Sequence, residues 1–387
     1  MYYFVTVNIL LSVNRYPTPN QPFTAFISVL AVELVRQGHN VDVVAPQSFL
    51  NIFKRKIGLL PFYSEYFVEE NKCIRVYRPK TFKLDRSIFK KLSLKFSQIA
   101  VSNTCKRIAR PDVCYGHFWS SAYNILPYAK KYNLPLFTAT GEDEIILQNN
   151  ISLSKLKELS EVCVGVICVS TKNKDESVRL GFTQASKCIV LPNSVDSKVF
   201  KLRDREQARK RLNILESDFV IVYVGRFNNR KGVMRVSEAI KRLDDDSIKS
   251  VFIGGQVEGK KLDPDCKGII FKGTLKHNQI PEYLSAADVF VLPTLAEGCS
   301  NSIVEALSCG LPIISSNLLF NHDILNSKNS IMIDPTSIDD IMSAIMKIKN
   351  NTKLANALRT GAIETAKALT IENRVKAITD FINSKKS

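Results

Sequence analysis

Short runs of β-forming residues alternate along this chain with longer segments whose apolar residues recur at helical spacing. Near the start, Tyr3–Leu11 is a β-rich run, Phe23–Gln37 has apolar residues at helical intervals, and Val41–Ala45 is a second β-rich run after Gly38. A strand, a helix and a strand in this order form the βαβ unit of a parallel sheet. The pattern predicts an α/β protein with doubly wound parallel sheets.

The alternation restarts in the second half of the chain, which indicates two domains. The turn cluster Leu191-Pro192-Asn193-Ser194-Val195-Asp196 separates the halves, and Phe219–Val224 begins a new series of strands. A chain of 387 residues is long enough for two domains with separate cores. We expect domains over residues 1–192 and 193–369, followed by a final helix over 370–387.

Two cations five residues apart, Arg226 and Lys231, lie in the loop Gly225-Arg226-Phe227-Asn228-Asn229-Arg230-Lys231-Gly232, which follows the strand Phe219–Val224. Glycine lets a ligand approach the backbone, and Arg226 and Lys231 could converge on a diphosphate. The spacing is not that of a Walker loop. The simpler alternative is a solvated basic loop.

Two carboxylates lie in the stretch from Pro293 to Ser316, on either side of a predicted helix start. Glu297 falls in a loop and Glu305 in the first turn of the helix, whose opening amides could bind a phosphate. Simpler alternatives exist for both: Glu297 as a solvated loop residue, and Glu305 as the partner of Ser302 in a capping box.

These motifs resemble those of retaining GT-B glycosyltransferases of family 4, also called group 1. The E-G-x-x-N loop with a second Glu eight residues after the first matches the family's E-x7-E signature, the loop 225–232 matches G-R-x-x-x-x-K-G, and the turn cluster resembles the linker P-N-G-V-D. The resemblance implies the GT-B fold, in which two Rossmann-like domains face a cleft. The first domain would be the acceptor side, the second would bind a nucleotide sugar, and the last helix would return to the first.

The resemblance also implies residue roles. Glu305 would hold the ribose, Glu297 the transferred sugar, and His117 would face the anomeric carbon, while the leaving phosphate helps to deprotonate the acceptor. We therefore expect catalytic roles for His117, Glu297, Arg226 and Lys231. The expected donor-binding residues are Gly225, Arg226, Lys231, Gly273, Thr274, Leu275, Glu297, Gly298, Cys299, Ser300, Asn301 and Glu305.

The first half departs from the family pattern at two places. Thr24 and Ala25 stand where members usually carry glycine before the first helix, and Thr140 replaces the histidine of the H-G-x-D loop. His117 follows a predicted strand at the end where open α/β sheets bind ligands. The alternative for a lone histidine is a structural hydrogen bond.

No metal or cofactor site is expected. The nine cysteines are scattered without a CxxC pair, and the four histidines are far apart in sequence. Asp263-Pro264-Asp265 spells a DxD motif but follows a Gly-Lys-Lys loop, so we interpret it as a turn.

Positive charge is concentrated between Lys72 and Arg110, where twelve basic residues face the single acid Asp85, a balance of +11 within a total of +17. Arg86–Arg110 predicts a helix with interleaved apolar residues and lysines. It is either an ordinary surface helix with an apolar inner face or a contact with an anionic membrane, which Lys54–Lys56 and Ile57–Tyr63 could extend. Met1–Val13 has the pattern of a buried strand rather than a signal peptide, and no apolar run spans a bilayer.

We therefore expect a cytoplasmic glycosyltransferase, at most peripheral at the inner face of the plasma membrane, with no nucleic-acid partner. It would move a sugar from a UDP-sugar or GDP-sugar to a glycan or lipid-linked acceptor in bacterial surface polysaccharide synthesis. Two alternatives stay open: another GT-B enzyme such as a sugar-nucleotide epimerase, and a non-catalytic membrane-associated subunit.

Overall fold

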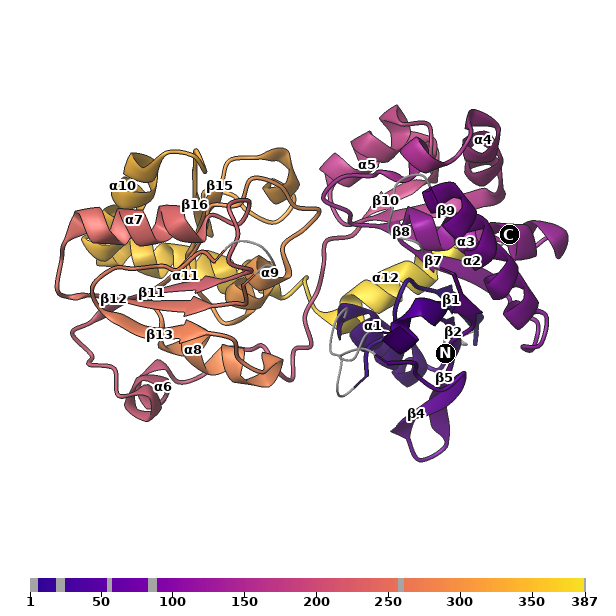
Figure 1. Cartoon of the computed structure of the whole chain (residues 1–387). Helices are drawn as coiled ribbons and strands as arrows, with labels where there is room; N and C mark the ends of the chain where they lie inside the picture. The colour runs from indigo at the N-terminus through magenta and orange to yellow at the C-terminus, as the bar shows by residue number, and fades with distance from the viewer. Residues whose placement is uncertain (1–5, 19–24, 54–57, 83–88, 257–260, 386–387) are drawn as a thin grey trace. The chain divides into compact units, whose positions relative to one another are not determined.

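A computed structural model describes residues 6–18, 25–53, 58–82, 89–256 and 261–385 (Figure 1). Their contacts divide the chain into two compact units. The first unit comprises Met1–Leu191 together with Arg374–Ser387, and the second comprises Pro192–Asn373. The chain therefore enters the second unit once and returns to the first at its end.

An eight-stranded sheet forms the centre of the first unit, in the order β10-β9-β8-β7-β1-β2-β5-β4. Neighbouring strands are parallel except for the antiparallel pair β4 and β5 at one edge. The order reverses between β1 and β7, and such a switch point is where open α/β sheets bind ligands. The strands are β1 (Asn8–Ser12), β2 (Asn40–Val44), β4 (Tyr63–Glu69), β5 (Lys72–Tyr77), β7 (Val113–His117), β8 (Leu136–Thr140), β9 (Cys163–Cys168) and β10 (Cys188–Val190).

The first unit's helices bury an apolar core against this sheet, with Trp119 and Phe137 fully enclosed. The helices are α1 (Ala25–Arg36), α2 (Lys90–Cys105), α3 (Trp119–Lys131), α4 (Leu153–Val162), α5 (Thr171–Arg179) and α12 (Ile371–Ser384), and a small separate sheet pairs β3 (Gln47–Ser48) with β6 (Lys80–Thr81). The ring of Phe381 on α12 lies 6.1 Å from that of Phe137 on β8. The last helix is thus part of the first unit's core.

The second unit has a six-stranded parallel sheet in the order β13-β12-β11-β14-β15-β16. Its switch point lies between β11 and β14. The strands are β11 (Phe219–Val224), β12 (Ile248–Ile253), β13 (Ile269–Gly273), β14 (Val289–Leu292), β15 (Ile313–Ser316) and β16 (Ser330–Ile333). The helices are α6 (Arg205–Leu212), α7 (Val233–Leu243), α8 (Ile280–Ala286), α9 (Asn301–Ser308), α10 (Ile338–Lys349) and α11 (Thr352–Ala366).

Helix α2 exposes apolar side chains that an ordinary surface helix would bury. Its buried residues are Ser97, Val101, Thr104 and Cys105. Four large apolar residues at intervals of three and four form the α2 stripe, and their exposed fractions are 39% for Phe89, 44% for Leu92, 38% for Phe96 and 49% for Ile99. The expectation of an apolar inner face is therefore wrong for these residues.

Parts of the predicted basic surface, Lys54–Ile57 and residues 83–88 with Arg86, lie outside the described residues, as does Thr24. Within the described ranges, no helix has the length and apolar character needed to cross a membrane.

Candidate active site

The two loops singled out in the second unit meet at its switch point. The loop 225–232 follows β11 and the loop 293–300 follows β14, and these strands are parallel neighbours. The backbone N–H of Leu295 donates to the carbonyl of Arg230 at 2.9 Å, and Nη2 of Arg235 donates to the carbonyl of Pro293 at 2.7 Å. Cation-bearing and carboxylate-bearing loops are thus fixed against each other.

Gly232 makes this close approach possible. Its φ is +80°, a conformation that glycine adopts at little cost. A Cβ atom there would lie only 2.7 Å from the carbonyl oxygen of Pro293. Any larger residue at 232 would push the two loops apart.

Lys231 and Glu297, predicted from separate motifs, form a direct ion pair. Only 13% of the Lys231 side chain and 8% of the Glu297 side chain are exposed. Thr294 Oγ1 donates to the same carboxylate at 2.8 Å, and Arg230 Nη1 lies 3.7 Å from its other oxygen. The interpretation of Glu297 as a solvated loop residue is therefore wrong.

Arg226 contrasts with Lys231 because it is exposed. Its backbone carbonyl accepts a hydrogen bond of 2.9 Å from the Tyr223 hydroxyl, which fixes the loop near the end of β11. Within the described part of the chain its guanidinium has no ion-pair partner. The guanidinium can therefore meet an anionic ligand without breaking an existing ion pair.

Helix α9 begins two residues earlier than the capping-box interpretation required. Ser300 is the N-cap and Asn301 the first helical residue, so Glu305 lies in the second turn and not the first. The Glu305 carboxylate bonds instead to Nε2 of His277 at 2.9 Å. The Ser300 side chain makes no capping hydrogen bond, so the amides at this helix tip could receive an anion.

The start of α9 is also held by Asn193, which the sequence indicated only as part of a linker. Its Nδ2 donates to the carbonyl of Cys299 at 2.9 Å and to Oδ1 of Asn301 at 2.8 Å. Gly298, Cys299 and Ser300 are buried, while Asn301 is exposed. The linker thus orders the loop that precedes the helix tip.

His277 connects the predicted nucleobase segment to Glu305. Gly273 ends β13, Thr274 and Leu275 follow, and His277 opens the short 3-10 turn that comes next. The His277 ring packs 4.9 Å from that of Phe200, and the hydrogen bond to the Glu305 carboxylate raises the pKa of His277, against the effect of desolvation. Sequence reasoning missed this pair because its partners are separated by 28 positions.

His117 is the last residue of β7 in the first unit. Gly116 permits the sharp turn into α3, because a Cβ atom there would lie 2.5 Å from the Ala122 backbone. The His117 ring packs against Phe26 and Phe118, at centroid distances of 5.2 and 4.7 Å. Burial, with a smaller effect of Arg374, lowers the pKa of His117 to about 3. His117 is therefore neutral at physiological pH.

Thr140, which replaces the family's histidine, holds the carboxylate of Glu142. Thr140 Oγ1 donates to it at 2.7 Å, and the backbone N–H groups of Gly141 and Trp119 donate at 2.9 and 3.0 Å. Burial raises the pKa of Glu142, although all three hydrogen bonds favour the charged form. Sequence reasoning singled out the position of Thr140 but passed over the carboxylate that it holds.

Asp263 and Asp265 of the DxD motif pair with lysines. Asp263 lies 2.7 Å from Lys272 and Asp265 lies 4.0 Å from Lys241. No cluster of three or more potential metal-binding side chains occurs among the residues whose placement is described.

Comparisons with known proteins bear on this arrangement. The family "Glycosyltransferase Family 4" matches residues 25–199 and the family "Glycosyl transferases group 1" matches residues 204–365. A Bacillus subtilis (strain 168) protein, provisionally named a teichuronic acid biosynthesis glycosyltransferase, is 28% identical over 363 residues, 89% of this chain and 90% of its own.

An Escherichia coli protein is also 28% identical, over 228 residues that make up 56% of this chain and 59% of its own. It is named UDP-Gal:alpha-D-GlcNAc-diphosphoundecaprenol alpha-1,3-galactosyltransferase. Among solved structures, sucrose-phosphate synthase from Thermosynechococcus elongatus superposes with a TM-score of 0.76 at 18% identity, over 97% of this chain and 98% of that one. These matches confirm the GT-B fold, and the chain belongs to the family 4, or group 1, glycosyltransferases.

Proposed function

We propose that this glycosyltransferase takes a sugar from a UDP-sugar or GDP-sugar and transfers it with retention of configuration at the anomeric carbon. The observation that carries the proposal is the ion pair between Lys231 and Glu297, because it brings the group expected to bind the diphosphate next to the group expected to bind the sugar. The UDP-galactose donor in the Escherichia coli relative's name supports a nucleotide-sugar donor here.

The donor diphosphate would be held by groups of three kinds. The planar guanidinium of Arg226 has no ion-pair partner in the described ranges and can donate two parallel hydrogen bonds. The ammonium group of Lys231 pairs with Glu297 and keeps two further N–H donors. The open amides at the start of α9 supply positive partial charge. Together these groups can stabilise the charge of the leaving diphosphate, so we propose that transfer needs neither a metal nor a cofactor.

Glu297 and Glu305 would hold the hydroxyl groups of the donor. Glu297 is held in place by Lys231 and Thr294 and would accept from the transferred sugar. Glu305, already paired with His277, would accept from the ribose. The neutral His117 would face the anomeric carbon without placing a charge there. The leaving phosphate would take the proton of the acceptor hydroxyl.

The acceptor would be a glycan or a lipid-linked sugar in surface polysaccharide synthesis, as the names of the two relatives suggest. The α2 stripe supports peripheral association of the enzyme with a membrane, because its exposed apolar residues are interleaved with the exposed Lys90, Lys91 and Lys95. Apolar side chains that enter a headgroup region and lysines that meet anionic lipids are the two parts of a peripheral contact.

A donor panel tests the proposed activity. The purified protein is incubated with individual UDP- and GDP-sugars, a chelator and membrane extract, and the release of UDP or GDP is followed with NMR of the new anomeric proton. We expect one donor to release its nucleotide and to yield a product with the donor's anomeric configuration. An inverted product would contradict retention, and absence of binding to every donor would favour a non-catalytic subunit.

A further inference from the structure

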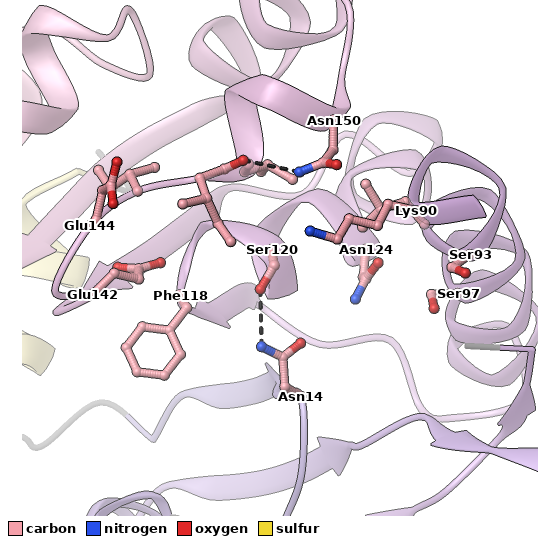
Figure 2. A pocket seen from close by; sticks show the side chains of 14 residues that line it. Asn14, Lys90, Ser93, Ser97, Phe118, Ser120, Asn124, Glu142, Glu144 and Asn150 are labelled. Carbon is pink, nitrogen blue, oxygen red and sulfur yellow. Dashed lines mark hydrogen bonds between the residues drawn. The ribbon is translucent and has the colours of Figure 1, made fainter. Parts of the chain in front are cut away.

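A pocket of about 450 Å³ opens in the first unit at the switch point between β1 and β7. Asn14 follows β1, Phe118 follows β7, and Ser120 and Asn124 lie on α3. The other walls come from the first half of α2 and the segment after β8. Its volume lies within the range of roughly 300–1,000 Å³ found for small-molecule sites. Figure 2 shows the side chains around this space.

The lining combines apolar walls with uncharged hydrogen-bonding groups. Leu94, Ile145 and Leu147 supply apolar surface, and the polar lining residues are mainly serines and asparagines. Asn14 Nδ2 donates to Ser120 Oγ at 3.0 Å, which orders one wall. Apolar contact beside many neutral polar groups suits a sugar ring, which has both a C–H face and hydroxyls.

Asn124 provides an unused acceptor in this lining. The residue is 3% exposed, and its Oδ1 accepts no hydrogen bond from any residue that the structure describes. Figure 2 shows its side chain between Ser120 and Lys90, facing the pocket. A buried acceptor without a donor is costly, so the site favours a ligand that donates a hydrogen bond there.

The charges of the lining are mainly negative. Glu142 and Glu144 both line the pocket, and among the described lining residues Lys90 is the single cation. Three donors fix the Glu142 carboxylate, while Glu144 is exposed. A third carboxylate, brought by a ligand, would be repelled, whereas hydroxyl groups would find acceptors.

Phe118 connects the pocket to His117. Its ring lines the pocket and also packs edge-on against the His117 ring at 4.7 Å. The Phe118 backbone has φ 76° and ψ 152°, a conformation that is strained for a residue with a side chain. Such strain often occurs at functional sites, where the surrounding structure holds the residue in place.

We infer that this pocket binds the terminal sugar of the acceptor and selects a neutral sugar over an acidic one. The inference rests on the proposed transferase activity. Asn124 and Glu142 accept hydrogen bonds from the sugar hydroxyls, Phe118 packs against the ring, and Glu142 and Glu144 reject a uronic acid.

The first test uses the unmodified protein and its donor with pairs of p-nitrophenyl glycosides. Each pair contains a neutral hexoside and the matching hexuronide, for example the glucoside and the glucuronide. We expect transfer to one of the neutral members, with kcat/KM at least tenfold higher than for its acidic counterpart. Equal or better transfer to the hexuronide would overturn the inference.

Variants then connect the preference to this pocket. Asn124→Leu should raise the acceptor KM roughly tenfold, because it removes one hydrogen bond to the sugar. Glu144→Lys, at an exposed position, should reduce the neutral-to-acidic ratio severalfold without affecting folding. Asn103→Leu is the matched control, because Asn103 lies exposed near the far end of α2 and outside the lining.

Donor binding, measured by calorimetry with the UDP- or GDP-sugar, separates the two hypotheses. If the unmodified protein binds no donor and transfers nothing, the proposed function fails. If donor binding and transfer are present but Asn124→Leu and Glu144→Lys leave acceptor KM and sugar preference unchanged, the pocket assignment alone is wrong. Thermal unfolding of each variant shows whether a loss arises from misfolding.

Discussion

Separating the stability role of the Lys231–Glu297 pair from its catalytic role requires a double-mutant cycle. The variants are Lys231→Met, Glu297→Gln and their combination, chosen to keep the size of each side chain. Either single change leaves the other charge in a site where no more than 13% of the side chain is exposed. We expect each single variant to have a lower free energy of unfolding than the double variant, because each single change leaves one buried charge without its partner.

The structure sets the expected magnitudes. Breaking one partner of a buried ion pair typically costs about 3–5 kcal/mol. After Lys231→Met, Glu297 keeps Thr294 Oγ1 at 2.8 Å and Arg230 at 3.7 Å, so we expect the lower end, about 3 kcal/mol. For a domain of this size, that corresponds to a decrease in Tm of about 6–12 °C. The double variant should recover at least about 1 kcal/mol of this loss, because neither Lys231 nor Glu297 is left as a buried charge without the other.

Calorimetric unfolding and nucleotide release measure the two roles independently. We expect the double variant to regain stability but to remain inactive, because transfer needs both groups. An additive loss of stability would show that the two side chains are not energetically coupled. Wild-type activity in the double variant would refute the assignment of both residues to the donor site.

Three further predictions concern membrane binding by the α2 stripe and the protonation of His277 and His117. Replacing Leu92 and Phe96 of the α2 stripe by serine should lower binding to phosphatidylglycerol vesicles at least tenfold in co-sedimentation. Leu215→Ser, at an exposed leucine of the second unit, should leave this binding unchanged. Equal vesicle binding by the wild type and the Leu92/Phe96 variant would contradict a membrane contact. The raised pKa of His277 means that its pairing with Glu305 stabilises the fold at pH 6 and is lost as the pH rises through the folded-state value. The Tm difference between wild type and His277→Gln should therefore shrink from pH 6 to pH 9, and a constant difference would refute the pairing. His117 has a lowered pKa of about 3, so the unfolded chain takes up a proton below pH ~6.5 that the folded chain does not. At pH 5 this costs about 2 kcal/mol, which His117→Gln should remove in denaturant unfolding; an unchanged pH dependence would argue against burial of a neutral ring.

The parallel sheets and the positions of the site loops could be predicted from sequence because they depend on local patterns. Phe219–Val224 is a continuous β-forming run, and the glycines at 225 and 232 bracket the loop that follows. Parallel pairing of β11 with β14 then brings Lys231 to Glu297. Here the local patterns identified both loops, and the strand order of the structure brings them together.

Other features depend on contacts that a local pattern does not contain. Ser300 and Ser302 are equally good N-caps, so the sequence could not decide whether Glu305 caps the helix or reaches His277. The periodicity of α2 shows that one face is apolar, but not that this face points to solvent. The unused acceptor of Asn124 becomes apparent only once its neighbours are placed. The donor contacts of Gly225, Gly273 and the 298–301 segment remain predictions.

The return of α12 to the first unit has a consequence for biosynthesis. Helix α12, with the buried Val375, Ile378 and Ile382, completes a core that is otherwise made of residues up to Leu191. On the ribosome, all of Pro192–Asn373 must be translated before this helix emerges, so the second unit can fold while the first still lacks its last element. Translation that stops after residue 373 would therefore release a complete second unit attached to a first unit with an open core, a species prone to aggregation and proteolysis.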